Sequence, residues 1–296
     1  MCNDPPVAGS PELPVAPRFE VLPFAKAEEQ AGRLTEPVRL TITTSPKHGV
    51  DRTLEHAERL RALGHGVTPH VAARMVRDRD HLDELLERAA AAGIDDLFVV
   101  GGDAAEPLGT YDSAGQLLGD LARHRLRPAS IGIGAYPEGH PLIAQDALDA
   151  ALEQKARIAT YIVTQLCFDT KVLLAWIGAL RARGIAHPLY VGAPGPIDRR
   201  KLLEISMRIG VGPSLRFVRK QRGLANLFRS PIDAATRLYD ELAPRVGDPR
   251  LGIAGFHFFT FNELLATESW ERERRERLAA GDRSGRVPLR ARLLGR

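Results

Sequence analysis

Short apolar runs alternate with amphipathic stretches along most of this chain. The clearest run is Tyr161–Asp169, where an apolar, partly β-branched body is followed by polar side chains and then by a helical pattern. A run that is apolar on both faces is typical of a buried parallel strand, and polar residues at the end of such a strand are typical of a binding site. The same plan recurs before and after this stretch.

The plan predicts eight strands separated by helices. The expected strands have short, apolar bodies and cover Arg18–Phe24, Arg39–Ser45, Gly66–Ala73, Asp96–Asp103, Ser130–Pro137, Tyr161–Asp169, Pro188–Gly195 and Gly252–Asn262. Their number and order predict a single-domain α/β fold, a (β/α)8 TIM barrel, with extra helices at about 214–228 and 233–242 before the last strand. An open doubly wound sheet has the same periodicity and stays an alternative.

Capping residues predict where several of the helices begin and end. Asp78 or Asp80 stands at the start of the helix that carries a Leu82/Leu85/Leu86 stripe, Ser113 precedes another helix, and Asp198 is expected to cap a helix that runs to Ile209. Gly64 and Gly184 follow expected helices at 53–63 and 171–183, where glycine can adopt the left-handed cap conformation.

Differences in composition along the chain predict a barrel domain with a separate segment at each end. Residues 1–17 are Pro-rich and are expected to form a flexible arm, residues 18–270 form the barrel, and 271–296 contain nine arginines. The net charge is +4, but the basic run lacks the interleaved aromatics of a nucleic-acid site, so we expect a solvated or disordered tail and no nucleic-acid partner.

Other whole-chain features favour a soluble globular protein. Hydrophobic residues make up 44% and charged residues 26%, and no stretch approaches the roughly 20 apolar residues of a membrane span. The N-terminus lacks a basic region followed by an apolar one, which predicts a cytoplasmic protein without a membrane partner. No disulfide framework is supported, because Cys2 lies in the expected flexible arm and Cys167 in an expected strand, and no metal site is expected, because no candidate ligands share a recognised spacing.

Polar side chains gather where the expected strands end, and a barrel would bring them to one face. They are Glu20, Thr43, Thr44, Ser45, His70, Asp103, Tyr136, Glu138, His140, Thr164, Gln165, His257, Thr260 and Asn262. No nucleophile elbow, P-loop, zinc-protease motif or dinucleotide fingerprint is present.

Five residues of this set carry specific expectations. A carboxyl in the buried strand around Glu20 should have a raised pKa and suit a general acid, unless the strand is an edge strand and Glu20 faces water. Gly101-Gly102-Asp103 is either a plain turn or a close approach to a ligand. His70 and His140 are either packing histidines or site residues. Gln165 is expected to be a buried amide that could pair with a heterocycle.

Several short motifs, taken in order, resemble those of methylenetetrahydrofolate reductases. Phe19-Glu20 with Pro23 resembles their Phe-Glu-Phe-Phe-Pro-Pro start, and Asp51-Arg52-Thr53, Pro69-His70 and Gly102-Asp103 resemble their Asp-Arg-Thr, Pro-His and Arg-Gly-Asp. Ala135–Pro141 is similar to their Ala-Tyr-Pro-Glu-x-His-Pro, Thr164–Asp169 to their Thr-Gln-x-x-x-Asp, and Phe256–Asn262 to their Phe-His-Phe-Tyr-Thr-x-Asn. The resemblance spans about residues 18–265.

The resemblance implies a barrel that reduces 5,10-methylenetetrahydrofolate to 5-methyltetrahydrofolate. It places Glu20 as the general acid, Asp103 near the pterin, and Thr43, Gln165, Thr164, Phe259 and Phe261 as folate contacts. His70, Gly102, Tyr136 and His140 are the implied cofactor contacts.

The chain departs from the family pattern where a flavin diphosphate would lie. Gly101 stands in place of an arginine, Glu153-Gln154 in place of an Arg-Lys pair, and Arg157-Ile158-Ala159 in place of Ala-Gly-Ala. Lost cations remove charge-assisted contacts worth about 1.5–3 kcal/mol each, so FAD binding is not expected. We therefore expect direct hydride transfer from NADH, with NADPH as the other possible donor. FAD held in an altered way, and a folate-binding barrel without catalysis, are the alternatives; the oligomeric state stays undetermined.

Overall fold

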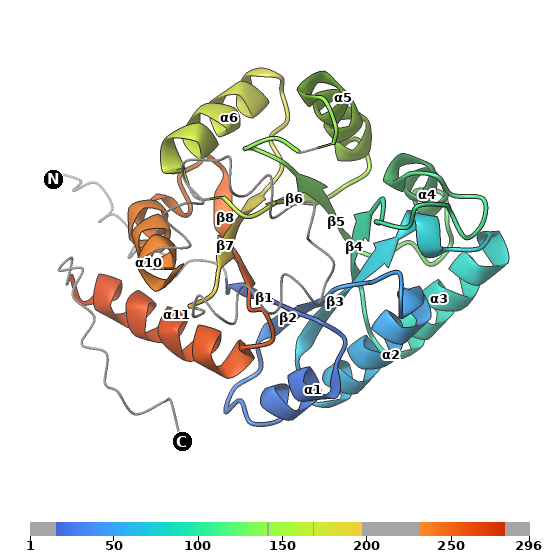
Figure 1. Cartoon of the computed structure of the whole chain (residues 1–296), viewed down its shortest axis with the longest axis horizontal. Helices are drawn as coiled ribbons and strands as arrows, with labels where there is room; N and C mark the ends of the chain where they lie inside the picture. The colour runs from blue at the N-terminus through green and yellow to red at the C-terminus, as the bar shows by residue number, and fades with distance from the viewer. Residues whose placement is uncertain (1–15, 141, 168, 197–230, 282–296) are drawn as a thin grey trace, which may run out of the picture.

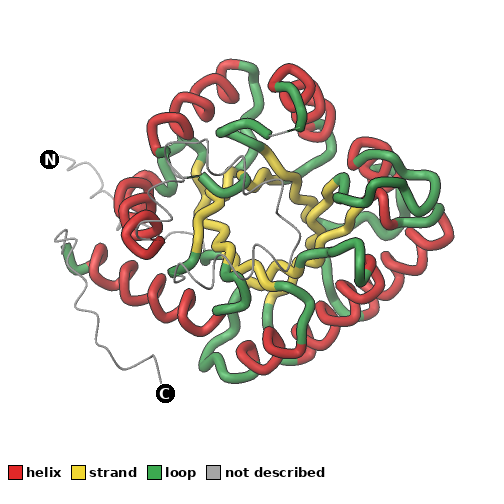
Figure 2. Tube along the Cα trace, viewed as in Figure 1, coloured by secondary structure: helices red, strands yellow, loops and turns green. Residues whose placement is uncertain are grey.

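A computed structural model describes residues 16–140, 142–167, 169–196 and 231–281. Several expectations lie outside these residues: most of the N-terminal arm, the helix expected after Asp198, the helix expected at 214–228, and the end of the C-terminal tail. The described chain forms a closed barrel of eight strands in sequence order, β1 to β8. The strands form the central ring in Figure 2, and the helices lie outside them (Figure 1).

All neighbouring strands are parallel, and β1 closes the barrel by pairing with both β2 and β8. The strands are β1 Arg18–Val21, β2 Arg39–Ile42, β3 Gly66–Ala72, β4 Asp96–Val100, β5 Ser130–Ala135, β6 Tyr161–Thr164, β7 Leu189–Pro194 and β8 Ile253–Phe259. The predicted barrel is therefore confirmed, and the open sheet is excluded. All eight strands end earlier than expected, because the last residues assigned to them belong to the loops that follow.

Helices follow the strands and cover the outside of the barrel. They are α1 Ala25–Ala31, α2 Gly49–Ala62, α3 Arg79–Ala91, α4 Ala114–Leu121, α5 Gln145–Ala156, α6 Thr170–Ala182, α10 Pro231–Leu242 and α11 Leu264–Ala279, with short 3-10 turns at Ala73–Met75 and Ala243–Arg245. Asp78 caps α3 and Ser113 caps α4, each accepting a backbone N–H three residues on. Gly64 and Gly184 adopt φ of 91° and 80°, as predicted for residues that follow helices.

Side chains along each strand point alternately into the barrel interior and outward into the core between the strands and the helices. In β1, Phe19 and Val21 are both 1% exposed and belong to the hydrophobic core, whereas Arg18 bonds to Asp96 across the barrel. Because successive side chains of a strand point to opposite faces, Glu20 shares the interior face with Arg18. The apolar strand residues thus pack against the helices, and the polar ones line the interior of the barrel.

The last helix corrects an expectation about the Arg-rich run. α11 continues to Ala279, so residues 271–279 are helical, although they were expected to begin a solvated tail. Glu271 and Arg274 are 3% and 5% exposed, and they bind Tyr239 and Asp240 of α10. The charges are tolerated because each has a partner from the neighbouring helix, a compensation that composition cannot reveal.

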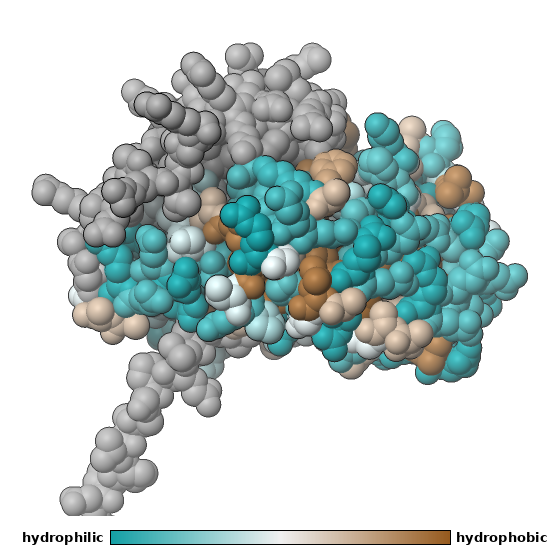
Figure 3. Space-filling model, turned by 90° about the horizontal axis from the view of Figure 1, so that it is seen from below, coloured by the Kyte–Doolittle hydropathy of each residue, from teal (hydrophilic) through white to brown (hydrophobic). Residues whose placement is uncertain are grey.

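The described surface in Figure 3 is mostly hydrophilic, with hydrophobic positions scattered among the polar ones. Among the described residues, no helix is long and apolar enough to cross a membrane.

Candidate active site

Glu20 lies one residue before the C-terminal end of β1, with its carboxyl inside the barrel. The side chain is 17% exposed, and its Oε2 lies 3.1 Å from Nε2 of His257 on β8 and 3.9 Å from Nε2 of His70 on β3. The backbone of Glu20 is held as well, because Thr260 donates its hydroxyl to the Glu20 carbonyl at 2.6 Å. The edge-strand alternative is wrong, since β1 has neighbours on both sides.

His70 is a buried neighbour of this carboxyl. Burial lowers the pKa of His70 to about 4, although Glu20 opposes the shift, so the ring is neutral near pH 7. The ring packs against Phe98 with centroids 4.7 Å apart, and its Nε2 has no hydrogen-bond partner within the described chain. His70 is thus both a packing residue and a polar group facing Glu20.

A network of buried polar side chains lies toward the N-terminal end of the interior. Nη1 of Arg18 bonds to Oδ2 of Asp96 at 2.8 Å and to the hydroxyl oxygens of Thr68 and Tyr161. The hydroxyl of Tyr161 donates to the other carboxylate oxygen of Asp96 at 3.0 Å. Gly132 leaves the space for Tyr161, because a Cβ there would lie 2.3 Å from the ring. These contacts close the interior beneath Glu20.

The turn after β8 secures the strand that carries Glu20. Phe261 and Asn262 have φ of 51° and 59°, a conformation that non-glycine residues rarely adopt. Oδ1 of Asn262 accepts the N–H of Leu22 at 2.7 Å, and this bond ties the turn to the end of β1. Phe259 and Phe261 are half-buried, and Phe259 packs edge-on against His257 at 5.1 Å. Phe259 therefore lies near Glu20, as a folate contact would require.

Asp103, Tyr136 and His140 form a second group at the ends of β4 and β5. The rings of Tyr136 and His140 meet edge-on at 5.1 Å. Burial raises the pKa of Tyr136, and Asp103 adds to that shift; burial lowers the pKa of His140, and Asp103 opposes it. The exposed carboxylate of Asp103 is therefore close to both rings. Gly102 precedes it with φ of 96°, so the Gly-Asp turn requires a glycine.

Two of the expected folate contacts are placed differently from the prediction. Gln165 was expected to be buried, but its side chain is exposed and its Oε1 accepts the N–H of Leu166 at 2.8 Å. Thr164 is 1% exposed, and its hydroxyl accepts the N–H of Gly192 at 2.8 Å, so it links β6 to β7. β6 ends at Thr164, and this early end puts Gln165 in an open loop.

Thr43 fits the expectation of a polar group available to a ligand. Its hydroxyl is buried and has no hydrogen-bond partner within the described residues, and its N–H bonds to the Val21 carbonyl at the end of β1. By contrast, the Asp-Arg-Thr motif braces the fold. Asp51 binds His81 of α3, and Thr53 donates its hydroxyl to the carbonyl of Thr43.

The sequence indicated His257 as a polar residue of the last strand and as part of a family motif, but not as a partner of Glu20; of the two described imidazoles beside the carboxyl, it makes the shorter contact. Its ring is 1% exposed. Strand alternation could have indicated its direction, since Phe256 and Phe258 are core residues on either side. The pairing itself depends on barrel closure.

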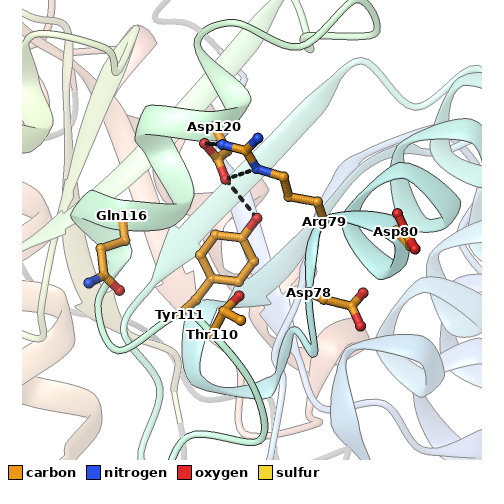
Figure 4. Close-up of a pocket in the computed structure, with 7 residues that line it drawn as sticks. All are labelled: Asp78, Arg79, Asp80, Thr110, Tyr111, Gln116 and Asp120. Carbon is orange, nitrogen blue, oxygen red and sulfur yellow. Dashed lines mark hydrogen bonds and ion pairs between the residues drawn. The ribbon is translucent and has the colours of Figure 1, made fainter.

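A separate open hollow of about 640 Å³ lies between α3 and α4. Arg79 and Tyr111 both bind Asp120 there, and Asp78 is the α3 cap (Figure 4). No predicted site residue lines it. Within the described chain, no group of three His, Cys, Asp or Glu residues could hold a metal ion.

Comparison with solved structures finds matches at low identity. Dihydropteroate synthase from Thermus thermophilus, in complex with 6HMPPP, is 17% identical with a TM-score of 0.47, covering 88% of this chain and 93% of that one. A GH18 chitinase from Cycas revoluta, in complex with (GlcNAc)3, is 11% identical with a TM-score of 0.45, covering 86% and 100%. These similarities carry no conclusion about activity.

Sequence comparison is more specific. Methylenetetrahydrofolate reductase 1 of Schizosaccharomyces pombe (strain 972 / ATCC 24843) is 28% identical over 121 residues, which cover 38% of this chain and 20% of that protein. The match therefore spans about a fifth of the relative's length. The family model for methylenetetrahydrofolate reductase matches residues 24–204, more than half of the chain. Glu20 and His257 lie outside that range, on strands that complete the same barrel. The chain belongs to the methylenetetrahydrofolate reductase family.

Proposed function

We propose that this protein reduces 5,10-methylenetetrahydrofolate to 5-methyltetrahydrofolate with a hydride taken directly from NADH. The observation that carries the proposal is the Glu20 carboxyl, which lies inside the barrel of a family member and contacts buried His257 at 3.1 Å. A partly buried carboxyl, 17% exposed, is suited to deliver a proton in a site that excludes most water.

The proposed chemistry consumes one proton and one hydride. Glu20 gives its proton to N10 of the folate as the bond between N10 and the bridging carbon breaks, which leaves an iminium at N5. The nicotinamide supplies the hydride that this carbon accepts, giving the 5-methyl group and NAD⁺. Solvent then returns a proton to Glu20. The exposed carboxylate of Asp103 stabilises the cation while it exists.

The residues of α5 do not fit a flavin diphosphate. The helix carries Asp146, Asp149 and Glu153, and the last two pair with Arg183 of α6 at 3.1 and 2.8 Å. A diphosphate there would meet carboxylates, two of which already pair with Arg183. Direct transfer requires only that the nicotinamide reach the folate, with the diphosphate of NADH lying elsewhere than beside α5; NADPH would serve the same chemistry.

One observation favours FAD as the second candidate. Lys155, the only basic residue of α5, donates to the Gly134 carbonyl at 3.2 Å and has no carboxylate partner within the described chain. Burial lowers its pKa, so an anionic group nearby would stabilise its charge. One lysine replaces fewer contacts than the family's cations make, and we therefore rank FAD second.

The test is a full-chain assay with NADH and methylenetetrahydrofolate, in which the 5-methyl product is identified by mass spectrometry. We expect NADH oxidation that depends on folate, from protein that shows no flavin absorbance near ~450 nm. Stoichiometric FAD in active protein would favour the second candidate. Folate binding without NADH oxidation, by wild type and by Glu20→Gln alike, would instead indicate a non-catalytic folate-binding barrel.

A further inference from the structure

Glu20 is approached on one oxygen by two imidazole rings. Nε2 of His257 lies 3.1 Å from Oε2, and Nε2 of His70 lies 3.9 Å from the same atom. The first distance is a hydrogen bond, and the second is too long for one. His257 is therefore the side chain that contacts the carboxyl, while Oε1 has no such contact with either ring.

The surroundings of His257 determine which of its nitrogens carries the proton. Its Nδ1 is buried and has no hydrogen-bond partner within the described residues. A proton on Nδ1 would leave a buried donor unpaired, whereas a proton on Nε2 is used in the bond to Glu20. The favoured tautomer thus donates from Nε2 to Oε2, and Oε1 is left to carry the acid proton.

Other charged groups around Glu20 do not replace this bond. His70, from β3, is neutral near pH 7 because burial lowers its pKa to about 4. Below Glu20 on the interior face, Arg18 is paired with Asp96 of β4 at 2.8 Å, and both bind the Tyr161 hydroxyl of β6. His70 and the Arg18–Asp96 pair therefore do not orient the carboxyl of Glu20, whereas the N–H of His257 can.

β8 and the residue that follows it hold Glu20 at two points. Thr260 donates to the Glu20 carbonyl at 2.6 Å, and His257, three residues earlier, donates to the carboxylate. The backbone and the side chain of Glu20 are thus fixed by β8 and the turn that follows it. The ring of His257 is itself held by Phe259 at 5.1 Å and by Phe98 at 6.4 Å.

We propose that His257 is a positioning residue, whose Nε2–H holds Oε2 of Glu20 and directs Oε1, with the acid proton, toward the folate N10. The inference rests on the proposed function, because it assigns a role toward the acid of that reaction. The contact with Glu20, however, can be tested without any substrate.

The experiment compares three variants of the full chain. His257→Phe keeps a ring of similar volume and removes the donor, whereas His257→Gln keeps an N–H at a similar reach. Phe256→Leu is the matched control, because Phe256 is a buried ring of the same strand that faces the outer core. If His257→Phe does not fold, His257→Asn, whose amide is too short to reach Glu20, takes its place.

The first readout is the titration of Glu20, followed by carbon NMR of protein labelled at the glutamate carboxyl and assigned by the signal missing in Glu20→Gln. Removing a donor from the carboxylate should raise the titration midpoint by about one pH unit in His257→Phe. We expect His257→Gln and Phe256→Leu to stay close to wild type. An unchanged midpoint in His257→Phe, or an equal shift in Phe256→Leu, would overturn the proposal.

The second readout is the pH profile of turnover. In His257→Phe, kcat should fall about tenfold or more with little change in KM for folate, and the high-pH limb of kcat should move upward with the NMR midpoint. In His257→Gln, both kcat and the position of its high-pH limb should be close to those of the wild type. The two failures are distinguishable: an inactive wild type contradicts the proposed function, while active enzyme with an unmoved midpoint contradicts the role of His257 alone.

Discussion

Arg18 of β1 and Asp96 of β4 meet across the interior of the barrel, with Nη1 and Oδ2 2.8 Å apart. Their side chains are 3% and 11% exposed, and the Tyr161 hydroxyl bonds to both. The guanidinium also lies 4.2 Å from the centroid of the Tyr161 ring. A buried charge pair of this kind is tolerated because its members satisfy one another within a hydrogen-bonded network.

Removing one member of this pair should destabilise the barrel strongly. Asp96→Asn leaves the Arg18 charge buried and uncompensated, so the free energy of unfolding should fall by about 3–5 kcal/mol. Urea unfolding measures this change. Glu87→Gln, at an exposed pair with Arg125, is the control and should change stability by less than about 1 kcal/mol. Equal effects of the two substitutions would contradict a structural role for the buried pair.

Glu20→Gln should abolish most turnover while leaving the fold intact. The amide keeps the size and hydrogen-bonding capacity of the side chain but cannot supply the acid proton, so kcat should fall about 10²- to 10⁴-fold. The thermal unfolding midpoint should stay about the same. Glu36→Gln, at an exposed position, should leave both quantities unchanged. Near-normal turnover in Glu20→Gln would show that the acid is another group, with Asp103 the next candidate.

Gln165→Ala should affect folate binding without affecting stability. The side chain is exposed, and within the described residues its amide bonds locally to Leu166, so its loss should cost the fold little. If it pairs with the pterin in the complex, one neutral hydrogen bond worth about 0.5–1.5 kcal/mol is lost, and KM for folate should rise roughly 2- to 12-fold. Steady-state kinetics measures the change, with exposed Gln154→Ala as the control. Unchanged folate kinetics would remove Gln165 from the site.

His70 should make the protein less stable as the pH falls below about 6.5. Burial lowers its folded-state pKa to about 4, below the unfolded value near 6.5, so in that window the unfolded chain binds a proton that the folded chain excludes. Stability is therefore fully present above pH 6.5. It should decrease by about 2 kcal/mol between pH 7 and pH 5 through this residue alone.

Urea unfolding of wild type and His70→Asn from pH 7 to pH 5 tests this dependence. Burial also lowers the pKa of His56 and of His65, so both proteins should keep some slope in the same direction. The wild-type slope should nonetheless be the steeper one. Parallel curves would show that His70 is protonated in the folded protein.

The sequence by itself determined the architecture, because each strand and most helix ends depend on local properties. Apolar runs at regular spacing predicted eight strands, and capping chemistry located Ser113 and Gly64 and limited the cap of α3 to Asp78 or Asp80, of which Asp78 is the cap. Since parallel strands with intervening helices point their C-terminal ends the same way, the sequence also placed Glu20, Thr43 and Asp103 toward one mouth.

Only the tertiary structure decided which polar groups meet. Glu20 and His257 are 237 positions apart, and their contact exists because β1 pairs with β8 in a register that sets Glu20 beside Phe259. Periodicity states which face a side chain takes, but not its partner on another strand. For the same reason the exposure of Gln165 and the buried charges of α11 were missed, since both depend on where neighbouring elements end and pack.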